Sequence, residues 1–183
     1  MISEYLYSMN ASKGWSFANG KKYIYCFLFL EFIFAMSESI PLRRLPKLVA
    51  FDLDGTIWNP EMYQLWSGGP PFKGDGNGHM TDRSGTKIEL LGVTREILHE
   101  MKTKPEWRDT KVAWVSCTDE PEWAEQLLGM FKTSGGDPIG SVVHSNQIFK
   151  ANKKTHFQRL KEEFPDIEYS DMLFFDNEMG NIR

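Results

Sequence analysis

The chain has 183 residues, with 21 lysines and arginines against 25 aspartates and glutamates, so its formal net charge at pH 7 is −4. This length is sufficient for one domain with a hydrophobic core. The small negative charge gives no general attraction to nucleic acid or to an anionic membrane, so neither partner is expected. The two cysteines, Cys26 and Cys117, lie far apart in segments of different character. This separation argues against a disulfide framework and favours a reducing compartment, so we expect a cytoplasmic location.

The first 36 residues differ from the rest, and we expect them to form an N-terminal extension to a domain at 37–183. Two lysines precede an apolar run, residues 23–36, which Glu31 interrupts. This run of about 14 residues is shorter than the ~20 that a helix needs to cross a bilayer, so no stable membrane span is expected. Two interpretations stay open. The extension is a targeting peptide, with a positive flank before an apolar segment, or an untranslated stretch upstream of a start at Met36.

A buried strand followed by two aspartates, LVAFDLDGT at 48–56, is the most informative stretch of the chain. The apolar residues 48–51 predict a strand that is buried on both faces. Asp52 and Asp54 follow it, and Gly55 marks the turn. The carboxyl end of such a strand is where open α/β sheets bind ligands. An Asp-Gly turn with an incidental second acid is the simpler alternative. The full order of strand and D-x-D-G-T is more specific and favours a functional site.

Residues 59–90 are rich in glycine, proline and polar residues, and we expect a flap or loop over the end of the first strand. A short strand at 87–90 is expected to return from this flap. The aromatic residues of this region either line the mouth of the site or pack the loop onto its own domain; they are Trp58, Tyr63, Trp66 and Phe72.

The remainder of the chain alternates helical apolar stripes with short apolar runs. We predict helices at 92–102, with Thr94 as N-cap, at 122–132 and from Asn152 onward, and strands at 111–115, 139–144 and 172–175. This alternation predicts an α/β fold, a Rossmann-like three-layer sandwich with a parallel sheet and helices on both faces. The sequence stops shortly after the last strand, so we expect a truncated C-terminus without a covering helix.

The ends of parallel strands share one edge of the sheet, so Asp52, Asp54, Ser116 and Asp176 are expected to converge. Such carboxylates suit Mg²⁺, with oxygens from Asp52, Asp176 and the main-chain carbonyl of Asp54. The four histidines lack the spacing of zinc ligands. Asp52 is then the expected nucleophile, which forms an aspartyl-phosphate. Asp54 is the expected general acid and base.

Three further residues are expected to bind the phosphate of the substrate. Ser116 would donate its hydroxyl to a phosphate oxygen, together with the backbone N–H of Cys117. Lys150, Lys153 and Lys154 compete to balance the charge. Lys153 is preferred because it shares the apolar stripe of its predicted helix; the alternative is that all three lysines are solvated.

These motifs resemble those of the haloacid dehalogenase superfamily of phosphatases. The resemblance runs through DLDGT at 52–56, Ser116 with Thr118, Lys153, and FFDNE at 174–178. Within the superfamily, residues 46–183 are most similar to the magnesium-dependent phosphatases of acid phosphatase type. This resemblance implies a magnesium-dependent phosphomonoesterase without a large cap domain. It further implies phosphotyrosine-type substrates, or sugar and fructosamine phosphates.

Two positions depart from that family's pattern. Cys117 stands where an arginine is usual, and Asn177 stands where a second aspartate is usual. With the short C-terminus, these departures keep an alternative open: a truncated, weakly active or inactive protein that only binds phosphorylated ligands. A cysteine-based tyrosine phosphatase is excluded, because Trp123 occupies the position of the arginine that such an enzyme needs. We expect a monomer.

Overall fold

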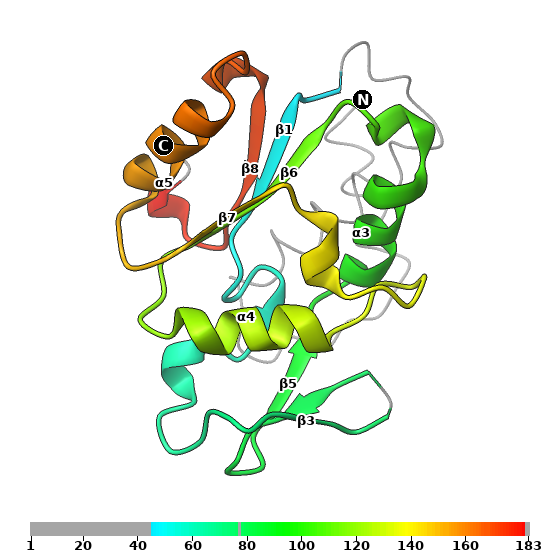
Figure 1. The fold of residues 1–183 in the computed structure, drawn as a ribbon. Helices are drawn as coiled ribbons and strands as arrows, with labels where there is room; N and C mark the ends of the chain where they lie inside the picture. The colour runs from blue at the N-terminus through cyan, green and yellow to red at the C-terminus, as the bar shows by residue number, and fades with distance from the viewer. Residues whose placement is uncertain (1–44, 77, 182–183) are drawn as a thin grey trace, which may run out of the picture.

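The computed structural model describes residues 45–76 and 78–181, which are built around a four-stranded parallel sheet (Figure 1). The expected N-terminal extension lies outside these residues. The strand order is β7 (Ser145–Ile148), β6 (Lys111–Ser116), β1 (Leu48–Phe51) and β8 (Met172–Phe175). The strand β1 is central and pairs in parallel with both β6 and β8 along its whole length. The first strand of the sequence therefore has a neighbour on each side, as its apolar run predicts.

Helices cover both faces of this sheet, which confirms the three-layer α/β prediction. Val49 and Phe51 of β1 pack in the larger core with α3 (Thr94–Thr103) and α4 (Pro121–Met130). Leu48 and Ala50 face the opposite way, into a smaller core under α5 (Lys153–Glu163). This alternation follows from the two-residue period of side chains along a strand.

The helix starts agree with the prediction at α5 and differ at α3. Asn152 is the N-cap of α5, and its side chain accepts a hydrogen bond from the N–H of Thr155. The prediction that Thr94 is the N-cap of α3 is wrong. Val93 is the N-cap, and the hydroxyl of Thr94 donates to the carbonyl of Leu91 at 2.6 Å. The cap at Asn152 makes Lys153 the first residue of its helix.

The third strand lies later than the prediction of 139–144. Residues Ile139–Val142 form a short 3-10 helix, and β7 is Ser145–Ile148. The apolar side chains of Ile139 and Val142 are buried in the larger core. These two apolar residues therefore indicate a buried turn, whereas the strand that follows carries mostly polar residues.

The flap contains a small antiparallel sheet in the order β2 (Trp58–Asn59), β5 (Lys87–Leu90), β4 (Met80–Thr81) and β3 (Lys73–Gly74). The strand expected at 87–90 is confirmed. Several apolar side chains of the flap are buried in the larger core, namely Met62, Leu65, Phe72, Met80 and Ile88. The flap is thus a packed insertion, and the described residues contain no large cap domain. No helix in this part of the chain has the length and apolar character to cross a membrane.

Candidate active site

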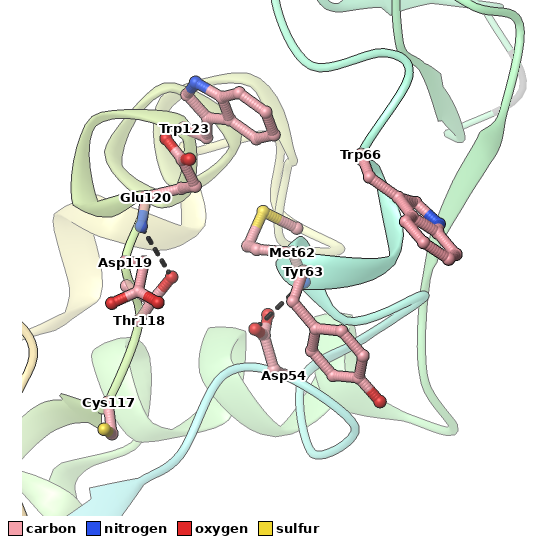
Figure 2. Close-up of a pocket in the computed structure, with 9 residues that line it drawn as sticks. All are labelled: Asp54, Met62, Tyr63, Trp66, Cys117, Thr118, Asp119, Glu120 and Trp123. Atoms are coloured by element: carbon pink, nitrogen blue, oxygen red, sulfur yellow. Dashed lines mark hydrogen bonds between the residues drawn. The ribbon is translucent and has the colours of Figure 1, made fainter.

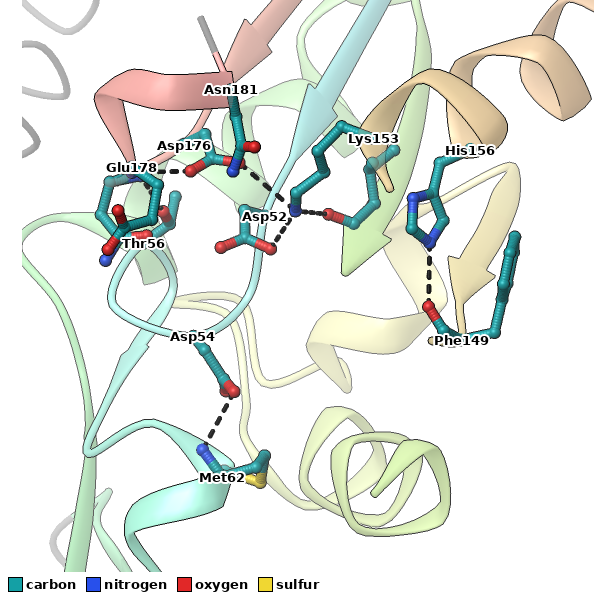
Figure 3. A network of polar contacts seen from close by, with 12 residues as sticks. Asp52, Asp54, Thr56, Met62, Phe149, Lys153, His156, Asp176, Glu178 and Asn181 are labelled. Carbon is teal, nitrogen blue, oxygen red and sulfur yellow. Dashed lines mark hydrogen bonds and ion pairs between the residues drawn. The ribbon is translucent and has the colours of Figure 1, made fainter. Parts of the chain in front are cut away.

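The carboxyl ends of β1 and β8 bring two aspartates to one amino group (Figure 3). The parallel register of these strands places Asp52 beside Asp176. Lys153 reaches between them, with its Nζ 2.6 Å from Oδ1 of Asp52 and 3.3 Å from Oδ2 of Asp176. The same Nζ donates a 2.7 Å hydrogen bond to the carbonyl of Val115 in β6. Residues more than a hundred positions apart in the sequence therefore meet at one edge of the sheet.

This cluster is buried and carries more negative than positive charge. The side chains of Lys153 and Asp52 are each 10% exposed, and that of Asp176 is 0% exposed. Burial raises the pKa of Asp52 to about 7, although Lys153 lowers it, and the charge of Asp176 raises it further. Two buried carboxylates beside one lysine favour either a proton on Asp52 or a second cation.

Hydrogen bonds hold Asp176 and join its loop to the turn after β1. The N–H of Glu178 donates to Oδ1 of Asp176 at 2.7 Å, and the side-chain amide of Asn181 donates to Oδ2 at 3.0 Å. The N–H of Asn177 donates to the hydroxyl oxygen of Thr56 at 3.0 Å. The first two hydrogen bonds fix the orientation of the Asp176 carboxylate, and the third joins its loop to the turn after β1.

The carboxylate of Asp54 turns away from this cluster and toward the flap. Its Oδ1 accepts a 2.8 Å hydrogen bond from Nε1 of Trp58, and its Oδ2 accepts one of 3.0 Å from the N–H of Met62. Burial raises the pKa of Asp54, while these two hydrogen bonds lower it, and the net shift is upward. Asp54 is therefore a separate group that is fixed in place by the flap.

The last residue of β6 and the residue after it are the two other predicted site residues. Ser116 is 2% exposed at the end of the strand, whereas Cys117 is exposed and borders a cavity. Thr118 is buried, and its hydroxyl accepts a 3.1 Å hydrogen bond from the N–H of Glu120. Cys117 is thus at the open surface, whereas Ser116 is buried.

Only one of the three candidate lysines reaches the aspartates among the residues that the structure describes. Lys153 does so from the first turn of α5. Lys150 forms a 2.6 Å ion pair with Asp119 at the surface, and Lys154 is exposed. Lys150 precedes the N-cap Asn152 and lies outside the helix. Lys154 is the next helix residue after Lys153, so its side chain points about 100° away from the aspartates.

A cavity of about 590 Å³ lies next to Asp54 (Figure 2). One wall is the segment from Cys117 to Glu120 with Trp123, and the facing wall comes from the flap with Met62, Tyr63 and Trp66. Asp54 lies between the two walls. The size of the cavity is that of a small-molecule site.

Comparisons with known proteins agree with this geometry. A family model described as Acid Phosphatase matches residues 44–183. The chain belongs to the acid phosphatase family. Magnesium-dependent phosphatase 1 of Homo sapiens is 35% identical over 144 residues, which cover 77% of this chain and 73% of that relative. A HAD-like hydrolase superfamily protein of Schizosaccharomyces pombe is 31% identical over 144 residues, covering 74% of this chain and 78% of the relative. The resemblance to the haloacid dehalogenase superfamily is confirmed.

A solved structure from Bacteroides fragilis was also found, the N-terminal part of a protein containing a phosphatase domain, complexed with Mg. It has a TM-score of 0.49 and 17% sequence identity to this acid phosphatase family member. The match covers 81% of this chain and 34% of that chain, so this chain spans about a third of its length.

In this acid phosphatase family member, a divalent cation would meet two carboxylate side chains. Among the described residues, no group of three or more histidine, cysteine, aspartate or glutamate side chains could hold a metal ion. The carboxylate of Asp54 is engaged by the flap, so only its main-chain carbonyl is available for the expected role. The oxygens of Asp52 and Asp176, with their excess negative charge, fit a hard cation that keeps several waters, such as Mg²⁺.

Trp58 is the functional residue that sequence reasoning missed in this acid phosphatase fold. It was expected only to line the site or to pack the loop, yet its indole N–H holds the carboxylate of Asp54. This contact depends on the tight turn between them, in which the N–H of Gly55 donates to the carbonyl of Trp58 at 2.9 Å. Gly55 has φ +71°, a conformation that glycine adopts without strain. The Gly55-Thr56 turn is the feature of the sequence from which this contact between Trp58 and Asp54 could be predicted.

Proposed function

We propose that this chain is a magnesium-dependent phosphomonoesterase that works through an aspartyl-phosphate on Asp52. The observation that carries the proposal is the contact of Lys153 with both Asp52 and Asp176, at the edge of the sheet near the cavity at Asp54. Membership of the acid phosphatase family and the name of the human relative support it. Proposed substrates are phosphotyrosine-type esters and sugar or fructosamine phosphates.

The first half of the reaction transfers the phosphoryl group to Asp52. A carboxylate oxygen of Asp52 attacks phosphorus, and the bond between phosphorus and the ester oxygen breaks. Lys153 already binds Oδ1 of Asp52, which leaves Oδ2 as the attacking oxygen. Asp54 gives its proton to the departing oxygen, and burial favours the protonated form that this step needs.

The second half releases inorganic phosphate. Asp54, now a carboxylate, takes a proton from a water molecule whose oxygen attacks phosphorus. The bond between phosphorus and the Asp52 oxygen breaks, which restores the carboxylate. Lys153 stays within reach of both aspartates and balances the charge on the transferred group.

Asp52, Asp176 and the main-chain carbonyl of Asp54 would hold the Mg²⁺. When bound, the ion supplies positive charge that lowers the pKa of Asp52 and neutralises phosphate oxygens. Asn177 contributes no charge beside this site, since an amide stands in place of a carboxylate. The hydrogen bonds from Glu178 and Asn181 orient the carboxylate of Asp176 for this role.

The proposal is tested by hydrolysis of para-nitrophenyl phosphate with Mg²⁺, with EDTA, and with the Asp52→Asn variant. We expect metal-dependent turnover that is lost in the variant. Asp109→Asn is the matched control, because the Asp109 side chain is 90% exposed in a surface ion pair with Arg108. Equal rates with metal, with chelator and in Asp52→Asn would contradict the proposal that the chain is an enzyme of this kind.

A further inference from the structure

Two loops at the edge of the main sheet carry the oxygens that are proposed to hold Mg²⁺. The loop after β1 carries the side chain of Asp52 and the main-chain carbonyl of Asp54, and the loop after β8 carries Asp176. The N–H of Asp52 donates a 2.8 Å hydrogen bond to the carbonyl of Phe175, which continues the pairing of the two strands. The distance between the loops beyond this bond depends on the contacts between their side chains and main chains.

Thr56 joins the two loops a second time, beyond the ends of the strands (Figure 3). Its side chain is fully buried, and its hydroxyl oxygen accepts a 3.0 Å hydrogen bond from the N–H of Asn177. Gly55 packs so closely on the side-chain amide of Asn177 that a Cβ atom at position 55 would overlap it. The turn that carries Thr56 is itself fixed, because the N–H groups of Thr56 and Ile57 both donate to the carbonyl of Leu53.

The carboxylate of Asp176 is held firmly by its own loop. Its Oδ1 accepts a 2.7 Å hydrogen bond from the N–H of Glu178, and its Oδ2 accepts one of 3.0 Å from the side chain of Asn181. A displacement of this loop would therefore carry the carboxylate with it. The contact between Thr56 and Asn177 thus fixes how far Asp176 lies from the loop after β1.

We propose that Thr56 is a positioning residue that makes the site selective for Mg²⁺ over Ca²⁺. This inference rests on the proposed Mg²⁺-dependent function and adds the residue that determines which divalent ion the site holds. Mg²⁺ requires short bonds in nearly ideal octahedral geometry, whereas Ca²⁺ accepts longer bonds and irregular geometry. A fixed separation between Asp176 and the loop after β1 therefore favours Mg²⁺, and a loosened separation weakens Mg²⁺ more than Ca²⁺.

The test measures the binding of each ion to the whole chain without turnover. The melting temperature is followed as MgCl₂ or CaCl₂ is added, which gives an apparent dissociation constant for each ion. Thr56→Val keeps the shape of the side chain but leaves the N–H of Asn177 without its acceptor. We expect Mg²⁺ to bind about tenfold more weakly to Thr56→Val, and the affinity for Ca²⁺ to change by about twofold or less. Thr56→Ser keeps the hydroxyl and should restore the preference for Mg²⁺.

A second substitution disturbs the same contact from its other side. Gly55→Ala forces the amide of Asn177 to move, so it should also lower the ratio of Mg²⁺ to Ca²⁺ affinity. Gly76→Ala is its matched control. Gly55 and Gly76 have similar positive φ values, +71° and +79°, but no described atom lies close to a Cβ at Gly76. Gly76→Ala should therefore keep the wild-type ratio.

Thr110→Val is the matched control for Thr56→Val. Thr110 is also buried, and its hydroxyl donates a 2.8 Å hydrogen bond to the carbonyl of Pro46. It precedes β6, at the edge of the sheet opposite to the site. Equal weakening of Mg²⁺ and Ca²⁺ in Thr56→Val, or the same change of ratio in Thr110→Val, would overturn the inference.

Hydrolysis of para-nitrophenyl phosphate by the wild type separates this inference from the proposed function. If the ester is hydrolysed with Mg²⁺ but the ratio of affinities is unchanged in Thr56→Val and in Gly55→Ala, the role of Thr56 is overturned and the phosphatase proposal stands. If the ratio changes as expected but the ester is not hydrolysed, the role of Thr56 stands and the phosphatase proposal fails.

Discussion

The Nζ of Lys153 contacts two carboxylates and one main-chain carbonyl oxygen in the site. Lys153→Met keeps the length of the side chain but removes the charge, so Asp52 and Asp176 repel each other and the transferred group loses a donor. We predict a fall in kcat of about a hundredfold, measured with para-nitrophenyl phosphate at saturating Mg²⁺.

The neighbouring Lys154 provides the control for this substitution, because it is exposed. Lys154→Met should leave kcat within about twofold of the wild type, as is usual for a solvated surface charge. A similar kcat in both variants would show that Lys153 does not act on the transferred group.

The indole N–H of Trp58 holds the carboxylate of Asp54. Trp58→Phe keeps a ring in this fully buried position but removes the hydrogen bond. Without this hydrogen bond, Asp54 should protonate the leaving oxygen less efficiently. We therefore predict a kcat about tenfold lower for an alkyl phosphate. An aryl phosphate should be affected less, because its leaving group needs little protonation.

Trp114→Phe is the matched control for Trp58→Phe. Trp114 is also fully buried, and its Nε1 is among the described buried atoms without a hydrogen-bond partner. Both variants disturb the core, but only Trp58→Phe should change the ratio of alkyl to aryl hydrolysis. The same ratio in the two variants would count against a role of Trp58 in positioning Asp54.

At the scale of elements, α5 carries Lys153 and is anchored by His156 three residues later. His156 is fully buried, and its Nε2 lies 3.0 Å from the carbonyl oxygen of Phe149. Burial lowers the pKa of His156 from its ordinary 6.5. The folded protein therefore holds the neutral ring, while the unfolded chain takes up a proton as the pH falls below 6.5. The stability that His156 contributes is complete above this pH and is lost below it.

His156→Gln should make this part of the pH dependence disappear. A glutamine amide still donates to the carbonyl of Phe149 but does not titrate. Urea unfolding from neutral pH down to about pH 5 should show a steeper loss of stability in the wild type than in the variant. Parallel curves for the two proteins would mean that His156 does not titrate on unfolding.

Strands with apolar runs could be predicted from the sequence, and β7 could not. The runs at β1, β6 and β8 are buried between neighbours, and burial demands apolar residues. β7 lies at the edge of the sheet. Its Ser145 and Gln147 are buried, and both donate hydrogen bonds to the carboxylate of Glu163 in α5. This polar packing leaves no hydrophobic pattern, and the prediction of a strand at 139–144 is wrong for that reason.

For the molecule as a whole, the edge of the main sheet and the strand at 87–90 could be predicted, whereas the packing of the rest of the flap could not. Asp52, Asp176 and Lys153 follow from strand ends and helical spacing, which are regular. The flap packs through isolated apolar residues within a polar sequence, and its strands β2, β3 and β4 have only two residues each. No periodicity arises over so short a length. The direction of the Asp54 side chain depends on that packing, so it was not predictable either.

Bound Mg²⁺ should stabilise the whole domain, because it offsets the excess charge of two buried carboxylates and has no comparable site in the unfolded chain. We predict that saturating Mg²⁺ raises the melting temperature by several degrees, measured by calorimetry. Asp176→Asn should abolish this increase. Asp171→Asn is the control, since Asp171 precedes β8 at its opposite end and pairs with Lys47 at 3.1 Å. An equal increase in Asp176→Asn would place the ion elsewhere.

The transfer of a phosphoryl group to Asp52 is tested most directly by trapping the enzyme during turnover. In Asp54→Asn, an aryl phosphate can still phosphorylate Asp52, but the base that activates water for the second step is missing. Acid-quenched protein should therefore gain the mass of one phosphoryl group, and peptide mapping should place it on Asp52. Hydrolysis that proceeds without any phosphorylated protein, or with the group on another residue, would contradict the mechanism.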